Sequence, residues 1–491
     1  MDPLGNPQLR EGAAGSGRAG RPREPPRSVP GRPGGGGLTE RDEALSLAEE
    51  ILDLSTADQT EVVLAGGRTA LTRFANSAIH QNVVSEDVSL ILRVVLGKQI
   101  GVARTNRTDL ASAKETLATA TRLAKAQKPL EDFVSLPEGG PVAAVPNFSP
   151  RTRDSTPEER AETVKEVIAE VGAWGAEKTF GALEATTVSQ TVVNSLGTSV
   201  YDEATLGHLV VSAIHEADGE KGYGWGTDLH VDISQLDPMA TSRAAGEKAV
   251  RSIRAKRVEP GEYTVILEDE AVSTLVFYLS YITFSALAYQ EGRSYISDKL
   301  GERVTGEGIT LWDEGTRPTG LPRAFDSEGV PKRKTTLVEE GIARSVVYDS
   351  YTAGREGRAS TGHALTAPNP FGPLAANPFL QPGDASLEEM VEETKRGLYI
   401  TRFHYANAVN PTKAILTGMT RDGTFLVEDG EVVGPVRNLR FTQGIMEALA
   451  EASLIGRDWR SHRLSSWLGF GATTVPPLRI DRFRFTGITE F

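Results

Sequence analysis

The N-terminal part of the chain switches between a helical period and short strand periods. Thr39 can cap a helix whose apolar residues recur at helical spacing between 44 and 52. Alternating runs then predict antiparallel strands at 60–64, 70–75, 88–96 and 99–104, separated by turns at Gly66-Gly67, Ser85–Asp87 and Gly97-Lys98. An amphipathic helix from about 109 to 126 follows. This order predicts helices packed on one face of an antiparallel sheet.

The central part repeats the same kinds of pattern. Pro157 and the acids after it predict the start of a helix that runs to about Trp174, because proline and negative charge both favour a helix N-terminus. Strand-like runs are expected at 180–194, 199–216 and 223–233, and another helix from about 238 to 256. We expect a second unit of helices and antiparallel strands.

The C-terminal part begins with the longest apolar run of the chain. A strand at 262–268 is expected to lead into one buried helix over 270–288. From residue 301 onward the sequence is rich in loops, with further elements expected as a helix at 386–396, a hairpin at 424–433 and a strand at 478–485.

The predicted fold class is α+β, and shifts in composition suggest the domain boundaries. The N-terminal α+β domain has an antiparallel sheet, a central α/β segment follows, and the C-terminal domain is mixed and loop-rich. The first segment is rich in Gly, Pro and Arg, which predicts disorder, and it is either a regulatory tail or the product of a start site placed too early. The predicted divisions are a tail at 1–38, an N-terminal domain at 39–127, a linker at 128–156, a central domain at 157–257 and a C-terminal domain at 258–491.

Composition disfavours several classes of partner. The 491 residues carry a formal net charge of −13, which argues against binding to nucleic acid or to an anionic membrane surface. There is no cysteine, so disulfides and thiolate metal sites are excluded. No apolar run suits a membrane span and no secretory signal is expected, so we expect a cytoplasmic protein.

Residues that could carry catalysis are scarce. The 7 histidines include no pair at the HExxH or HxxxH spacing that would set two imidazoles on one helix face. We therefore assign no catalytic residue, no metal ligand and no cofactor to this chain.

One loop, at 348–364, combines residue types that bind peptides or proteins. Its glycines let a ligand approach the backbone, and its arginines can pair with carboxylates or backbone carbonyls. The alternative is an ordered surface loop that satisfies its own hydrogen bonds. The candidate peptide or partner contacts are Tyr351, Arg355, Arg358 and His363.

Several segments, in this order, resemble the TldD/PmbA peptidase family over nearly the whole chain after residue 38. No single motif is diagnostic, but their order and spacing together are fairly specific. The matching stretches are 72–82, 97–101, 106–109, 297–304, 312–316, 326–329, 360–364 and 397–401.

The resemblance implies a cytoplasmic heterodimer of two kinds of subunit. The TldD-like subunit carries an HExxxH helix and a downstream cysteine that complete a zinc site, whereas the PmbA-like (TldE) subunit keeps the fold without the metal. Here the corresponding stretch, roughly Val276 to Ala286, reads VFYLSYITFSA and holds no His, Glu or Cys. This chain therefore resembles the PmbA/TldE subunit, and zinc is expected in its partner.

The function expected from this resemblance is that of a non-catalytic subunit of a heterodimeric zinc peptidase. Related pairs act on unfolded or modified peptides. The alternatives are an autonomous peptidase with an unrecognised site, and a non-enzymatic peptide-binding or scaffold homodimer.

Overall fold

The computed structural model describes residues 40–464 and 470–489, and the expected tail at 1–38 lies outside them. The described residues confirm the α+β fold class with antiparallel sheets. Among them, no helix combines the length and the apolar character that crossing a membrane requires.

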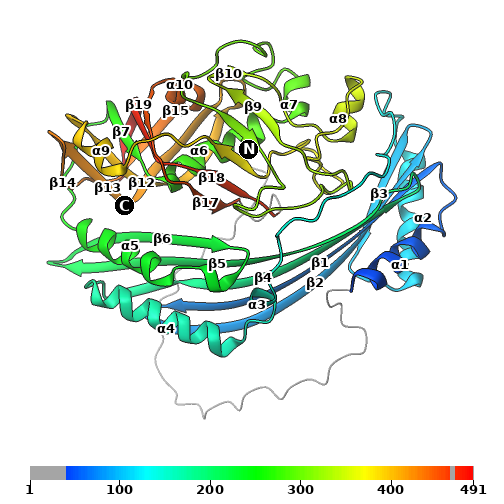
Figure 1. Cartoon of the computed structure of the whole chain (residues 1–491), viewed down its shortest axis with the longest axis horizontal. Helices are drawn as coiled ribbons and strands as arrows, with labels where there is room; N and C mark the ends of the chain where they lie inside the picture. Colours follow the sequence, from blue (N-terminus) through cyan, green and yellow to red (C-terminus); the bar gives the residue numbers. More distant parts are fainter. Residues whose placement is uncertain (1–39, 465–469, 490–491) are drawn as a thin grey trace, which may run out of the picture. The chain divides into compact units, whose positions relative to one another are not determined.

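Six long strands form one antiparallel sheet in the order β3-β2-β1-β4-β5-β6 (Figure 1). Strand β1 pairs with β2 along one edge and with β4 along the other. Strands of the expected N-terminal and central domains thus share one sheet, and the boundary between those domains stays a prediction. The strands are β1 Gln59–Ala75, β2 Ala78–Leu96, β3 Gln99–Thr105, β4 Lys178–Asn194, β5 Ser199–Ala217 and β6 Glu220–His230.

The turns expected at Gly66-Gly67 and Ser85–Asp87 are wrong, because β1 and β2 continue through them. Gly66 pairs with Val88, and Gly67 pairs with Asp87, in an unbroken register. Strand β1 has a neighbour on each side, so its glycines are held in the ladder despite their weak strand preference.

Four helices cover one face of this sheet (Figure 1). Val62 and Leu64 point toward these helices, whereas Val63 points to the opposite face and packs with Phe325 of the C-terminal region. We call the face that carries Val63 the inner face. The four helices are α1 Arg41–Leu52, α2 Leu110–Ala126, α4 Pro157–Ala173 and α5 Pro238–Arg251.

Glycines on β6 allow α5 to lie against the sheet at close range. Gly222, Gly224 and Gly226 alternate along the strand and therefore share one face. A Cβ atom on Gly224 would lie 1.9 Å from the backbone oxygen of Ala245 in α5. Any larger residue would push the helix away from the sheet.

A closed ring of five strands forms the core of the C-terminal region. Strand β12 pairs with β7 and with β13, and β15 and β19 complete the ring. The predicted hairpin is confirmed, since β13 and β14 pair through Glu428 and Glu431. The ring strands and two attached ones are β7 Glu262–Leu267, β12 Arg396–Asn410, β13 Ile415–Glu428, β14 Glu431–Pro435, β15 Leu439–Gly444, β16 Ala452–Ile455 and β19 Leu478–Ile488.

A second, mixed sheet lies in the same region, in the order β10-β9-β8-β11-β18-β17. Its strands are β8 Leu311–Asp313, β9 Thr335–Glu339, β10 Ile342–Ala343, β11 Pro378–Leu380, β17 Arg460–Arg463 and β18 Ala472–Val475.

The remaining helices are mostly short. Helix α9 ends well before the expected residue 396, because Arg396 already pairs with Glu428 as the first residue of β12. These helices are α3 Pro150–Arg153, α6 Asp269–Ile282, α7 Ala286–Gln290, α8 Ser350–Arg355, α9 Leu387–Glu392 and α10 Ile445–Ala450, with 3-10 turns η1 Ile233–Gln235 and η2 Pro411–Lys413.

The close approach of α5 predicts a marked difference between two Gly→Ala substitutions in the same sheet. Gly224→Ala should lower the free energy of unfolding by about 1–3 kcal/mol, the usual cost of overpacking, because the new methyl group meets helix backbone. Gly67→Ala should have little effect, since no atom lies within 4 Å of a Cβ built there. Urea denaturation followed by circular dichroism measures both, and equal stability of the two variants would contradict the close packing.

Candidate functional site

Helix α6 holds most of the apolar stretch noted in the sequence. It ends at Ile282, where the Phe284 N–H donates to the Leu279 carbonyl, and the Ala286 N–H donates to the carbonyl of Val347. The single helix expected over 270–288 is therefore wrong. The bridge between Ser285 and Val347 interrupts it, and α7 begins as a separate helix.

The segment 276–286 does not fit a zinc ion. Val276 and Leu279 are buried in the main core. The half-buried Tyr278 donates its hydroxyl to the Ala406 carbonyl, and burial raises the pKa of this phenol. Tyr281 meets the ring of Phe371 edge-on, with centroids 6.1 Å apart.

Hydrocarbon and neutral phenol groups are not ligands of Zn²⁺ in protein sites, which use imidazole, thiolate and carboxylate. Across residues 40–464 and 470–489, no three His, Cys, Asp or Glu side chains are grouped so that they could hold a metal.

A buried ion cluster fixes the N-terminal end of α6. His462 of β17 shares a hydrogen bond of 2.7 Å with Asp269, and its Nδ1 lies 2.6 Å from Glu270 without hydrogen-bond geometry. Burial alone would lower the pKa of His462, but the two carboxylates overcome it and raise this pKa to about 10. His462 is therefore an imidazolium that joins α6 to the mixed sheet.

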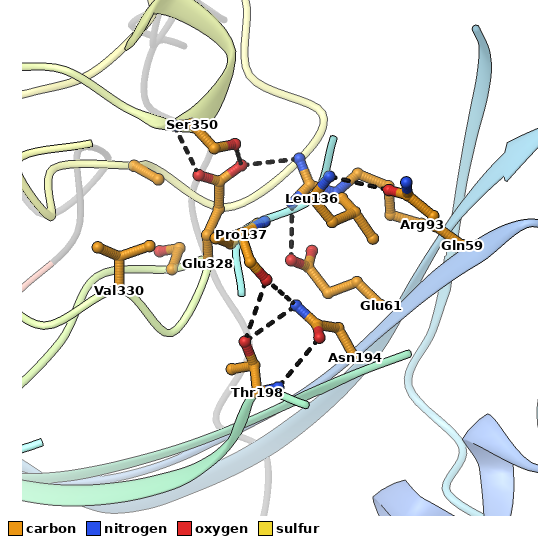
Figure 2. A network of polar contacts seen from close by, with 12 residues as sticks. Gln59, Glu61, Arg93, Leu136, Pro137, Asn194, Thr198, Glu328, Val330 and Ser350 are labelled. Atoms are coloured by element: carbon orange, nitrogen blue, oxygen red, sulfur yellow. Dashed lines mark hydrogen bonds and ion pairs between the residues drawn. The ribbon is translucent and has the colours of Figure 1, made fainter. Parts of the chain in front are cut away.

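A second buried ion cluster joins the sheet to the loops of the C-terminal region. Figure 2 shows Arg93 of β2 between Glu61 of β1 and Glu328. The Arg93 Nη2 atom lies 2.6 Å from Glu61 Oε2, and Nη1 lies 2.9 Å from Glu328 Oε1. Glu328 also accepts hydrogen bonds from the N–H and hydroxyl groups of Ser350, the first residue of α8. Burial alone would lower the pKa of Arg93, but the two carboxylates raise it above its ordinary value. Arg93 is thus always charged, and it holds the 326–330 loop and α8 against the inner face.

A cavity of about 370 Å³ lies between the inner face and the C-terminal loops. Its lining includes Arg323, Asp326, Lys332, Phe371 and Phe470. Arg323 donates to Asp202 and to Gln190 of the sheet. Aromatic walls beside fixed polar groups can hold a short stretch of peptide.

Two charged groups in this cavity are strongly affected by burial. Burial raises the pKa of Asp326 to about 7, against the hydrogen bonds that it accepts from the N–H groups of Glu328, Val330 and Ala364. Burial lowers the pKa of Lys332, whose ammonium donates to the Gly362 carbonyl at 3.0 Å. These hydrogen bonds order the loops around the cavity.

Three of the four contact residues expected in the 348–364 loop lie on or near its surface. Tyr351 is half-buried in α8 and packs near Phe133 and Leu136. Arg355 lies 3.4 Å from Asp132, and the largely exposed Arg358 lies 3.1 Å from Glu356. Their role as contacts stays a prediction.

His363 does not fit a surface contact. The side chain is fully buried, with Nδ1 2.8 Å from the Thr361 hydroxyl and Nε2 2.8 Å from Asp313. Burial lowers the pKa of His363 even beside Asp313. The Thr-His-Asp order resembles a catalytic triad, but the hydroxyl also bonds the backbone of Tyr348, and the side chains of His363 and Asp313 are fully buried. This group stabilises the loop.

No pattern in the sequence pointed to His462, Lys332 or Arg93. Their partners are 193, 30 and 235 residues away in the chain, so no local spacing could have identified them. For His462 the sequence showed only that no second histidine lies at a spacing suited to a shared metal ion.

The His462 cluster predicts a pH-dependent contribution to stability. The folded-state pKa of His462 lies above its ordinary value of 6.5, so its stabilisation is complete below pH 6.5 and fades as pH rises toward 10. The pKa values of Asp269 and Glu270 are lowered from 3.8 and 4.5, so their share is lost as pH falls below that range. His462→Gln should cost about 3–5 kcal/mol near pH 5–6.5 and clearly less at pH 9–10.

Urea unfolding across this pH range measures the His462 effect. His230→Gln is the matched control, because His230 is exposed and bonds only its neighbouring backbone. A constant difference between wild type and His462→Gln from pH 5 to pH 10 would show that folding does not raise the pKa of His462, and would contradict its charged role in the cluster.

The Arg93 cluster predicts a large loss of stability on removal of the cation. Arg93→Met leaves two buried carboxylates unpaired and should cost about 3–5 kcal/mol. Adding Glu61→Gln and Glu328→Gln to Arg93→Met should recover much of the lost free energy of unfolding. Thermal unfolding measures each variant, with Arg107→Ala as the control from an exposed ion pair. Equal stability of Arg93→Met and wild type would contradict this role.

Family models match most of the chain. A model of PmbA/TldA metallopeptidase domain 1 matches residues 60–124, one of the central domain matches 150–253, and one of the C-terminal domain matches 260–487. A metalloprotease of Methanothermobacter thermautotrophicus is 29% identical over 244 residues, or 49% of this chain and 53% of that protein. The chain thus spans about half the length of such curated relatives.

Solved structures share the fold. TldE from Thermococcus kodakarensis superposes with a TM-score of 0.81 and 22% identity, over 91% of this chain and 99% of that one. A Thermotoga maritima protein with a suggested role as a modulator of a DNA gyrase gives 0.80 and 21%, over 90% and 99%. With its three matched domains in order, this chain belongs to the PmbA/TldD metallopeptidase family.

Proposed function

We propose that this chain is the metal-free subunit of a cytoplasmic, heterodimeric zinc peptidase, and that it encloses the path of unfolded or modified peptides. Its partner would be a TldD-like subunit that supplies the zinc site. The observation that carries the proposal is the segment 276–286, where packed apolar and phenolic side chains fill the stretch to which the resemblance assigns the HExxxH motif of TldD-like subunits.

The packing of this segment argues for a structural role. A catalytic zinc needs about three protein ligands and an open position for water, and here Leu279 and Ser280 are buried while Tyr281 is covered by Phe371. Binding a metal would require new ligands and new space at once. What the segment supplies instead is packing in the core of the C-terminal region.

The cavity at the inner face supports the peptide-binding part of the proposal. It is lined by Phe371, Phe470 and a proline-rich loop, and its polar groups are held in place by buried bonds. A preorganised surface of this kind binds an extended chain at low entropic cost.

Co-purification with the TldD-like protein of the same organism tests the proposal. We expect a stable complex that cleaves casein, little cleavage by either subunit alone, and zinc only in the partner. Metal analysis of the isolated, tag-free chain gives a separate readout. Stoichiometric zinc in this chain, lost together with its own peptidase activity on chelation, would overturn the proposal.

The contact residues of the 348–364 loop give a second test. The double variant Arg355→Glu and Arg358→Glu should weaken either the complex or its cleavage of peptides by about tenfold, because two cations become anions at the proposed contact. Arg344→Glu is the control, since Arg344 is similarly exposed and also pairs with an acid. Wild-type assembly and activity in the double variant would remove these residues from the proposed contact.

A further inference from the structure

A second cavity, of about 360 Å³, lies on the inner face near the end of β1. Its walls combine the aromatic ring of Phe180 and the side chain of Val210 with a set of charged and imidazole groups. Those groups are Arg73, His80, Glu184, His208 and Arg463.

A β-bulge brings two of these groups to the same face. Arg73 pairs with Gln81 and Phe74 pairs with Ile79, which leaves His80 as the extra residue of β2. Bulges of this kind redirect a side chain and are frequent beside binding sites. As a result, His80 lines the cavity together with Arg73, although β2 belongs to the edge of the sheet at this point.

The charges in this cavity are predominantly positive. Glu184 is the only acid that lines it, and Arg463 binds this carboxylate at 2.8 Å. Arg73 is exposed, and no ion pair joins it to any acid in the described part of the chain. Burial first, and then Arg463, lower the pKa of His208 to about 4, so this imidazole is neutral and keeps a hydrogen bond with Thr227. A cationic site in a chain of net charge −13 is unusual enough to suggest an anionic ligand.

The geometry points to a subsite for a carboxylate carried by an extended peptide, with Arg73 as its main cation. The planar guanidinium of Arg73 can bind both carboxylate oxygens, while Phe180 and Val210 pack against the neighbouring peptide atoms. The ligand class is either a C-terminal carboxylate or an Asp or Glu side chain.

The subsite lies on the same inner face as the cavity of about 370 Å³ that Arg323 and Phe470 line. Glu184 lines one cavity and Gln190 the other, and both residues point to the inner face from β4. Six positions along a strand span about 20 Å, which is the length of about six extended residues. The subsite thus rests on the proposed function, since it would hold one end of a peptide on the same face.

Fluorescence anisotropy with the full chain tests the subsite. The probes are fluorescein-labelled ten-residue Ala/Ser peptides in three forms: a free C-terminal acid, the C-terminal amide, and the amide with one internal glutamate. We expect the free acid or the glutamate peptide to bind at least about tenfold more tightly than the plain amide. The form that gains affinity identifies the source of the carboxylate.

Substitutions at Arg73 locate the effect. Arg73→Gln should remove the preference for the carboxylate peptides over the plain amide, and Arg73→Lys should restore part of this preference. Arg104→Gln is the matched control, because Arg104 is an exposed arginine on the same sheet, opposite Ile91 in the register.

Two results would overturn the subsite. One is equal affinity for all three peptides, including no binding of any of them. The other is an unchanged carboxylate preference in Arg73→Gln. Neither result bears on the proposed function, which depends on complex formation with a TldD-like subunit and on the metal content of the two chains.

Discussion

The buried charge of Arg93 is the constraint on which the arrangement of this protein depends. A guanidinium removed from water needs partners that offset its lost hydration, and here two carboxylates supply them, one from the sheet and one from a loop more than two hundred residues later. The cluster therefore ties the C-terminal loops to the sheet at a defined place. Glu328 also accepts hydrogen bonds from the N–H and hydroxyl groups of Ser350, so Arg93 fixes the start of α8 through this carboxylate.

The same principle operates at α6 with a different ion. His462 is charged because Asp269 and Glu270 enclose it, and together they connect the start of an apolar helix to the mixed sheet. The apolar residues that follow, among them Val276 and Leu279, pack into the main core of the C-terminal region.

The inner face of the long sheet collects the features that suggest binding. One cavity there has aromatic walls and polar groups held by buried bonds, and another has an excess of positive charge. Both depend on strands that run unbroken through Gly66-Gly67, since a turn at that point would have divided the face. The unbroken length of β1 and β4 therefore keeps both cavities on one continuous face.

Sequence alone determined the features that depend on local pattern or on residue type. The α+β class, the order of helices and strands, the hairpin at Glu428–Glu431 and the lack of metal donors at 276–286 all follow from periodicity, turn residues and side-chain chemistry. Tertiary structure decided where local preference was weak or where partners are distant. Neighbouring strands held Gly66 and Gly67 in a ladder, Val347 interrupted the apolar helix, and Asp313 drew His363 into the core. These outcomes depend on burial and on contacts across many residues, which no local window of the chain records.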